Sequence, residues 1–195
     1  KWVYYENDSS KLNYNMTENY IEPMKLPQYY QADDRWGAKR YGLSNMKLTG
    51  CVPTALAMAI SGLKEDVNPV QVADFLYNMT MELNTTFLGT SSLGVQEVVS
   101  QWGLNYKVID SKEELEKTLK NGTLVYGAVG HGIFVNGYST HAILLTGYEN
   151  GKTKAFDPDN MAKTNKWYNI DDIWKERSLA PEDNMTGGAF IAIYK

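Results

Sequence analysis

The sequence has very little cysteine and histidine, and no long apolar run. Of 195 residues, one is Cys and two are His. A single Cys excludes an intramolecular disulfide, and one Cys with two His falls short of a typical four-ligand zinc set. No apolar run approaches the roughly 18 residues that a membrane-spanning helix needs. We therefore expect no disulfide, no metal or other cofactor and no membrane span.

The chain also carries little excess charge of either sign. The formal net charge of −4 comes from 19 Lys and Arg against 23 Asp and Glu, which are mixed along the chain without a basic block. Phosphate binding needs clustered Lys and Arg, so nucleic acid is not an expected partner. The apolar share of 43% and the charged share of 22% are those of an ordinary globular domain. We expect one such domain, as a monomer.

The first residues differ in composition from the rest. Residues 1–22 are rich in aromatic residues and Asn and show no helical period. We predict that they form an N-terminal arm or linker, either a short hairpin or a strand packed on the main domain, and that residues 23–195 form that domain. The arm is weakly similar to the aromatic repeats with which Gram-positive surface proteins bind cell wall, which adds the cell wall to the expected partners.

Helix signals dominate the first half of the domain. Residues 53–62 are apolar on nearly every side, which predicts a fully buried helix with Pro53 in its first turn and Gly62 at its exit. Further helices are predicted after the Asn68-Pro69 cap, over residues 94–102, and after the capping box of Ser111 and Glu114.

The period then changes to that of strands. Residues 123–129, 142–148 and 188–194 are short β-rich runs, and Asn150-Gly151 is a strong hairpin signal between residues 142–148 and 153–158. Helices first and antiparallel strands afterwards indicate an α+β fold. We expect an N-terminal helical part whose buried helix packs on a C-terminal antiparallel sheet.

Cys51 stands directly before the buried helix. The free N–H groups and the dipole at a helix N-terminus favour a thiolate over a thiol, and a nearby protonated His adds to this. Gly50 removes side-chain bulk beside the sulfur and leaves room for a substrate carbonyl. A structural Cys is more often found in mid-helix, so this position favours a nucleophile.

The general base must be one of two histidines. His141 opens the apolar strand, where a rigid element can hold the ring at the rim of the core. His131 lies between Gly130 and Gly132, a flexible setting that is poor for positioning a base. We predict that His141 is the base.

A third group should orient the imidazole, and three candidates lie across the hairpin. A plain two-residue turn at Asn150-Gly151 places Asn160 opposite His141. A bulge at Gly151 places Asp159 opposite His141 and Asp157 on the diagonal. Spacing alone leaves Asp157, Asp159 and Asn160 open.

Taken together, these motifs resemble a known family. PQYYQADDRW, GCVPTALAMAI and THAILLTGYENGKTKAFDPDN are similar to the papain-like cysteine peptidases related to bacteriocin leader peptidases, which cleave after double glycine. The stand-alone, secreted relatives from Gram-positive bacteria are the nearer match. The resemblance runs from about residue 26 to residue 195 and implies the papain-like fold and an extracellular or cell-surface location.

The resemblance also implies roles for individual residues. Cys51 is the nucleophile, His141 the base, and the Asp of the Asp-Pro pair, Asp157, the orienting acid. A Gln upstream of the nucleophile helps to hold the oxyanion together with the backbone N–H of Cys51, and the matching position is Gln31, with Gln28 as its rival.

Two features of the sequence depart from the family pattern. Many relatives have Gly after the Cys, where this chain has Val52, which would narrow one wall of the cleft. In the leader peptidases the Gln lies close before the Cys, whereas 20 positions separate Gln31 from Cys51 here. The intervening loop must fold back to bring the two together.

Three functions fit these residues. The first is a cysteine peptidase that hydrolyses a peptide or amide bond in a peptide or protein substrate through a thioester acyl-enzyme. The second keeps the thiol but changes the acceptor, as in an acyltransferase or cell-wall amidase. The third is a non-catalytic cell-surface binding module on the same fold, because a fold alone does not fix function.

Overall fold

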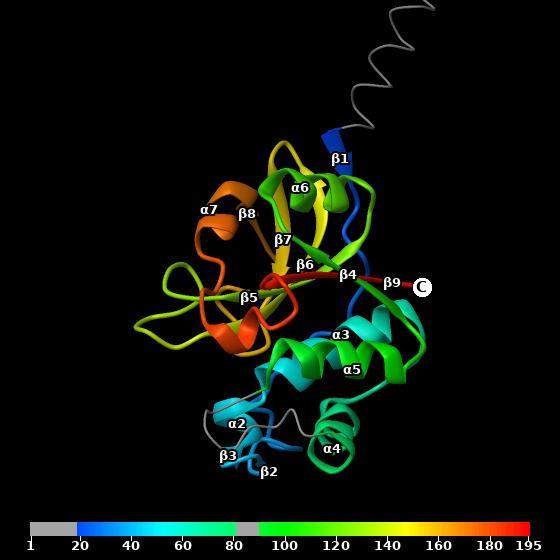
Figure 1. Cartoon of the computed structure of the whole chain (residues 1–195), viewed down its shortest axis with the longest axis vertical. Coiled ribbons are helices and arrows are strands. Elements are labelled where there is room, and N and C mark those ends of the chain that lie inside the picture. Colours follow the sequence, from blue (N-terminus) through cyan, green and yellow to red (C-terminus); the bar gives the residue numbers. More distant parts are fainter. Residues whose placement is uncertain (1–18, 81–89) are drawn as a thin grey trace, which may run out of the picture.

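The computed structural model describes residues 19–80 and 90–195, so the predicted arm lies largely outside the described residues. The helices between residues 46 and 101 gather in the lower half of Figure 1, and the large sheet lies in the upper half with the later helices against it. The helices are α2 (Met46–Thr49), α3 (Cys51–Leu63), α4 (Pro69–Met79), α5 (Ser92–Gln101), α6 (Lys112–Lys120), α7 (Ile170–Lys175) and a 3-10 turn, η1 (Pro181–Asp183). None of these is long and apolar enough to cross a membrane.

The strands form a seven-stranded antiparallel sheet and a small hairpin. The order in the large sheet is β4-β9-β5-β6-β7-β8, with β1 paired to the end of β6. Its strands are β1 (Tyr20–Ile21), β4 (Asn105–Ile109), β5 (Leu124–Val129), β6 (His141–Glu149), β7 (Lys152–Phe156), β8 (Lys166–Asn169) and β9 (Phe190–Tyr194). The hairpin joins β2 (Arg40–Tyr41) to β3 (Ser44–Asn45). All pairings are antiparallel, so the α+β prediction is confirmed.

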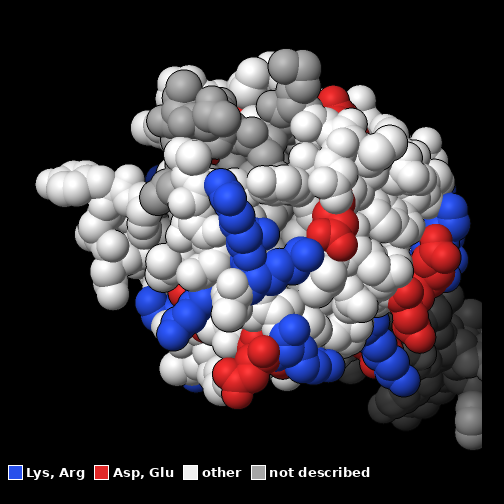
Figure 2. Space-filling view, turned by 90° about the horizontal axis from the view of Figure 1, so that it is seen from below, with Lys and Arg blue, Asp and Glu red and all other residues white. Residues whose placement is uncertain are grey.

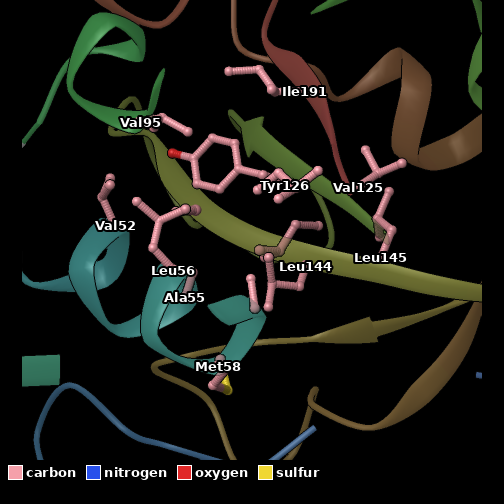
Figure 3. Close-up of a cluster of buried hydrophobic side chains, with 14 of the residues drawn as sticks. Val52, Ala55, Leu56, Met58, Val95, Val125, Tyr126, Leu144, Leu145 and Ile191 are labelled. Carbon is pink, nitrogen blue, oxygen red and sulfur yellow. The ribbon is translucent and has the colours of Figure 1, made fainter. Parts of the chain in front are cut away.

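Helix α3 lies at the centre of the molecule. Nine consecutive residues, Val52–Ile60, are buried, because α4 and α5 cover one side of the helix and β5 and β6 cover another. Figure 3 shows Leu56 and Ala55 facing Leu144 of β6 and Tyr126 of β5. The predicted packing of this helix on the sheet is confirmed. Burial on all sides fixes the direction of α3 and therefore the position of its first residue.

The predicted ends of α3 were wrong by one to two residues. The helix begins at Cys51 itself, with Gly50 as its N-cap, and it continues through Gly62 to Leu63. Gly62 is small for a packing reason, since a Cβ there would lie 2.3 Å from the Leu26 side chain. Gly62, which was predicted to end the helix, is therefore a contact point for the N-terminal segment.

Local capping signals set the starts of two other helices. The Asn68 side chain accepts from the Gln71 N–H, and the Gln71 side chain accepts from the Asn68 N–H, which completes a capping box before α4. At α6, Ser111 accepts from the Glu114 N–H, but Glu114 reaches one residue further back, to the Asp110 N–H. Both helices start where the sequence predicts.

The β6–β7 hairpin has both a tight turn and a bulge. Asn150 and Gly151 have φ values of 48° and 81°, and Glu149 pairs with Lys152, so the turn has two residues. The register then shifts by one residue between Thr146 and Glu149. The bulge therefore lies on β6, around Gly147, and not at Gly151 as the bulged alternative placed it.

Gly147 is required at the bulge by a crossing of the chain. Its φ is +78°, and a Cβ there would lie 2.6 Å from Pro23. The N-terminal segment thus passes directly against β6, where Met24 donates its N–H to Thr146 Oγ1 over 2.9 Å. The bulge shifts the register by one residue, so that Leu144 pairs with Phe156 and the residues after β7 lie beside His141.

Candidate active site

A cleft of about 820 Å³ lies between the helical part and the sheet. One wall comes from residues 31–52, including Gln31 and Cys51, and the other from β5, β6 and the residues around Asp159. The loop between β5 and β6 adds Phe134 and Tyr138 to the rim. Residues that are far apart in sequence therefore meet in one concave site.

The start of α3 holds Cys51 in this cleft. As the first helical residue, Cys51 has a backbone N–H without an intrahelical acceptor, and the positive end of the helix dipole lies at its side chain. The preceding residue must be small, because a Cβ on Gly50 would lie 2.5 Å from the Met46 carbonyl oxygen. The thiol is partly exposed to the cleft, which a nucleophile requires.

His141 faces Cys51 from the sheet. It is the first residue of β6 and pairs with Val129 of β5, so its backbone belongs to the rigid sheet. The side chain is 11% exposed, and its Nε2 lies 2.7 Å from Asp157 Oδ1. Because Nε2 donates to Asp157, Nδ1 is the ring nitrogen left to face the thiol.

The surroundings of His141 favour its protonated form. Burial by itself lowers the pKa of His141, but hydrogen bonds to Asp157 and Cys51, and attraction to their charges, raise the pKa from 6.5 to about 10. An imidazolium is therefore stable here across neutral pH. A proton held in this way can stabilise a thiolate and can later pass to a leaving amine.

Asp157 is the candidate that reaches His141. It is fully buried, and its Oδ1 accepts hydrogen bonds from His141 Nε2 and from the backbone N–H groups of Asp159 and Asn160, at 2.8 and 3.1 Å. The other two candidates thus contribute their backbones to the site. Asp157 Oδ2 is buried and makes no hydrogen bond to the described residues.

Gln31 lies in the same cleft as Cys51 and His141. Its side chain is buried, lines the cleft, and donates one Nε2–H to the Lys47 carbonyl over 2.9 Å. An amide nitrogen has a second hydrogen, which is available to an oxyanion next to Cys51. Gln28, its rival, does not line the cleft and instead binds the backbone of Asp157.

The long loop between Gln31 and Cys51 folds back through local structure. The β2–β3 hairpin reverses the chain, and the N–H groups of Met46 and Lys47 then bind the carbonyls of Lys39 and Gly37. This places the Lys47 carbonyl against the Gln31 side chain. The segment between Gln31 and Cys51 is thus folded into compact local structure.

His131 is not brought to Cys51. Its ring is exposed in the loop between β5 and β6, where Nδ1 lies 3.3 Å from the Gly137 N–H. In the same loop, the Ile133 N–H donates to Glu176 over 3.0 Å. The pKa of Glu176 is raised, and burial of its carboxyl group is the largest cause. His131 and Glu176 therefore shape the loop that forms the cleft rim.

Several residues of the cleft wall carry no recognisable sequence signal. Tyr126 of β5 lies on its floor, and its hydroxyl points toward the Val52 end of α3 (Figure 3). Asp183 is buried at one end, where it accepts from Ser178 Oγ over 2.6 Å, and burial raises its pKa. No motif marks these positions, because they reach the cleft through the sheet and through the loop after α7.

Charges on the face below the helices are mixed. Figure 2 shows Lys and Arg among Asp and Glu on this face, with wide uncharged areas between them. In the segment that returns the chain to Cys51, Arg35 pairs with Asp33 and Lys39 pairs with Asp74. Paired charges of opposite sign produce weak fields at a distance. The reactivity of Cys51 should therefore depend mainly on its immediate neighbours.

Within residues 19–80 and 90–195, no three His, Cys, Asp or Glu side chains gather in a way that could hold a metal ion. The chemistry that the described site can perform is that of a thiol beside an imidazole. A buried carboxylate orients the imidazole, and the Gln31 side chain lines the same cleft.

The family of the chain comes from comparison with known proteins. The Peptidase_C39 like family matches residues 24–186, which is most of the chain. No curated protein matches the chain closely enough to count as a relative.

Solved structures of low sequence identity share the fold. A protein from Bacillus anthracis assigned to the C39-like peptidases has a TM-score of 0.59 at 16% identity, over 90% of this chain and 98% of that one. The peptidase domain of Streptococcus ComA has a TM-score of 0.52 at 18% identity, over 75% and 90%. A double glycine motif protease from an AMS/PCAT transporter, in complex with the leader peptide, has 0.50 at 19%, over 88% and 91%. At such identities the likeness shows the fold alone.

Proposed function

We propose that this chain, which belongs to the Peptidase_C39 like family, is a cysteine peptidase. It hydrolyses a peptide or amide bond through a thioester acyl-enzyme. In this proposal Cys51 is the nucleophile, His141 the general acid and base, and Asp157 the orienting acid. Gln31 and the Cys51 N–H hold the oxyanion. The observation that carries the proposal is the meeting of Cys51 and His141 in one open cleft, where His141 is hydrogen-bonded to the buried Asp157 and interacts with Cys51.

The first half of the reaction forms the acyl-enzyme. The Cys51 thiolate attacks the scissile carbonyl carbon, and the carbonyl oxygen becomes an oxyanion between Gln31 Nε2 and the Cys51 N–H. The C–N bond then breaks, and the imidazolium of His141 gives its proton to the leaving amine. The acyl group remains on sulfur as a thioester.

The second half releases the acyl group. The neutral imidazole of His141 takes a proton from a water molecule, and the resulting hydroxide attacks the thioester carbonyl. The C–S bond breaks, the carboxylic acid leaves, and the thiolate–imidazolium pair forms again. Asp157 holds the ring in one orientation through both halves and stabilises its charge.

The test is to analyse the products of a peptide library incubated with the protein in the presence and absence of a small primary amine. We expect cleaved peptides with free carboxylates, which appear at equal rates with and without the amine. Products that carry the amine in place of a carboxylate would instead assign the thioester to acyl transfer. An uncleaved library, with no thioester visible by mass spectrometry, would contradict the proposal.

The role proposed for Gln31 gives a separate prediction. Gln31→Ala removes a donor that acts on the oxyanion and not on the bound substrate, so kcat should fall by about 10²- to 10³-fold while KM changes little. Steady-state kinetics with one cleaved peptide measure both constants. Gln96→Ala, on α5 and outside the cleft, is the matched control and should resemble the wild type. An unchanged kcat in Gln31→Ala would remove Gln31 from the mechanism.

A further inference from the structure

Gln28 uses all of its side-chain polar groups although it does not line the cleft. Its Nε2 donates to the carbonyls of Tyr29, at 3.0 Å, and Asp157, at 3.1 Å. Its Oε1 accepts from Thr164 Oγ1 over 2.6 Å. Because both amide hydrogens are donated and the amide oxygen accepts, the side chain has one orientation, so Gln28 is a fixed element of the site.

Thr164 completes the network on the other side of Asp157. Its hydroxyl accepts from the Asp157 N–H over 2.9 Å while it donates to Gln28. Gln28 and Thr164 therefore hold both the N–H and the carbonyl of Asp157. Thr164 is buried, so water does not replace the hydroxyl if it is removed.

The same segment also carries Gln31. The Gln31 N–H donates to the Pro158 carbonyl over 2.8 Å, one residue beyond Asp157. Residues 28–31 are thus tied to residues 157–158 from both ends, although more than a hundred positions separate them in the chain. A shift of this segment would move the oxyanion donor and the orienting acid together.

From this network we infer that Gln28 and Thr164 are positioning residues that hold the backbone of Asp157 so that its carboxylate points at His141. The inference rests on the proposed function for its catalytic meaning. The position of the Asp157 backbone sets the direction of its carboxylate. A displacement of about 1 Å at a catalytic group can lower the rate on the order of 10²-fold. Gln28, first considered as an oxyanion donor, acts in this account on the acid.

The experiment follows the two histidines by NMR as pH is varied, because the chain has only His131 and His141 and their signals are simple to assign. In wild type the His141 signal should titrate with a pKa of about 10. In Thr164→Val and in Gln28→Leu we expect a downward shift of about one unit, since the carboxylate no longer lies in place. The alkaline limb of kcat/KM should move down by the same amount.

Three further variants separate positioning from a loss of stability. Thr164→Ser keeps the hydroxyl and should restore the wild-type titration of His141. Thr118→Val removes a hydroxyl that bonds only within α6, and Gln96→Leu removes an amide on α5, so neither should move the titration. The groups that face His141 directly are Cys51 and Asp157, and no variant changes either of them.

The inference is overturned if His141 titrates as in wild type in folded Gln28→Leu and Thr164→Val. Gln28 is half-buried, so Gln28→Leu alone decides the matter if Thr164→Val does not fold. The NMR titration does not depend on turnover. A shifted titration in a protein that cleaves no peptide would support the positioning role and reject the proposed function, and the two failures are therefore distinct.

Discussion

Replacing Cys51 by Ala is expected to lower peptide hydrolysis by at least about 10⁴-fold, because no acyl-enzyme can form without the thiol. The residual rate would come from the oxyanion donors and from substrate binding alone. The stability should change little, since the side chain is partly exposed and Ala is a good helix former at the start of α3. Initial rates with one cleaved peptide, together with a thermal melt, measure both effects.

The single Cys provides a chemical control for this variant. Alkylation of the wild type can modify only Cys51, so the alkylated protein and Cys51→Ala should show the same loss of activity. If Cys51→Ala keeps a tenth or so of the wild-type rate, the nucleophile must be another group. The hydroxyls of Ser139 and Thr140, which line the same cleft, would then be the first to examine.

Asp157→Asn should shift the pH range of activity and leave the geometry in place. Asp157 Oδ1 accepts all three of the hydrogen bonds to the carboxylate, and Oδ2 accepts none from the described residues. An Asn side chain with its oxygen at the Oδ1 position therefore keeps these bonds and loses the charge. Without that charge the pKa of His141 should fall from about 10 by about one to three units.

The sign of the effect follows from the role of the imidazolium. His141 must be protonated to release the leaving amine, so the alkaline limb of kcat/KM should lie near pH 10 in wild type and lower in Asp157→Asn. The raised pKa also links to stability. Its contribution is fully present below about pH 6.5 and is lost as pH rises through about 10. Melting temperatures across this window should fall more steeply for wild type than for Asp157→Asn.

An alkaline limb at the same pH in both proteins would contradict this account of Asp157. The same holds for a melting temperature whose pH dependence does not change. Either result would mean that the carboxylate does not set the protonation of His141.

Elements with local signals were predicted well from the sequence. Asn68-Pro69 and Ser111 mark helix starts because their side chains cap the neighbouring N–H groups. Asn150-Gly151 marks a tight turn because both residues adopt positive φ. The resemblance to the bacteriocin leader peptidases is confirmed by the family match over residues 24–186.

Two strands of the large sheet were missed because their patterns are weak. In β4 the first three of five residues are exposed, and in β8 no residue is fully buried, so neither shows a clear alternation of apolar and polar residues. Both are set by pairing with neighbours, β4 with β9 and β8 with β7. Such pairings join distant segments and leave little trace in a short window.

Spacing could not choose among Asp157, Asp159 and Asn160 for a similar reason, and only the family resemblance indicated Asp157. The choice depends on a bulge around Gly147, at the point where Pro23 packs against β6. The approach of Gln31 to Cys51 likewise depends on the β2–β3 hairpin. Contacts between segments far apart in the chain decided both, whereas the proposed nucleophile and base were marked by their own positions at a helix start and a strand start.

The account depends above all on a thiolate at the start of α3 that is paired with the imidazolium of His141. The most direct measurement is the rate at which iodoacetamide labels Cys51 as a function of pH, in wild type and in His141→Ala. Wild type should label rapidly already at about pH 6, and His141→Ala should label slowly there and approach the wild-type rate only as pH nears that of an ordinary thiol, about 8.5. Identical profiles that both rise only near about pH 8.5 would contradict the pairing of Cys51 with His141.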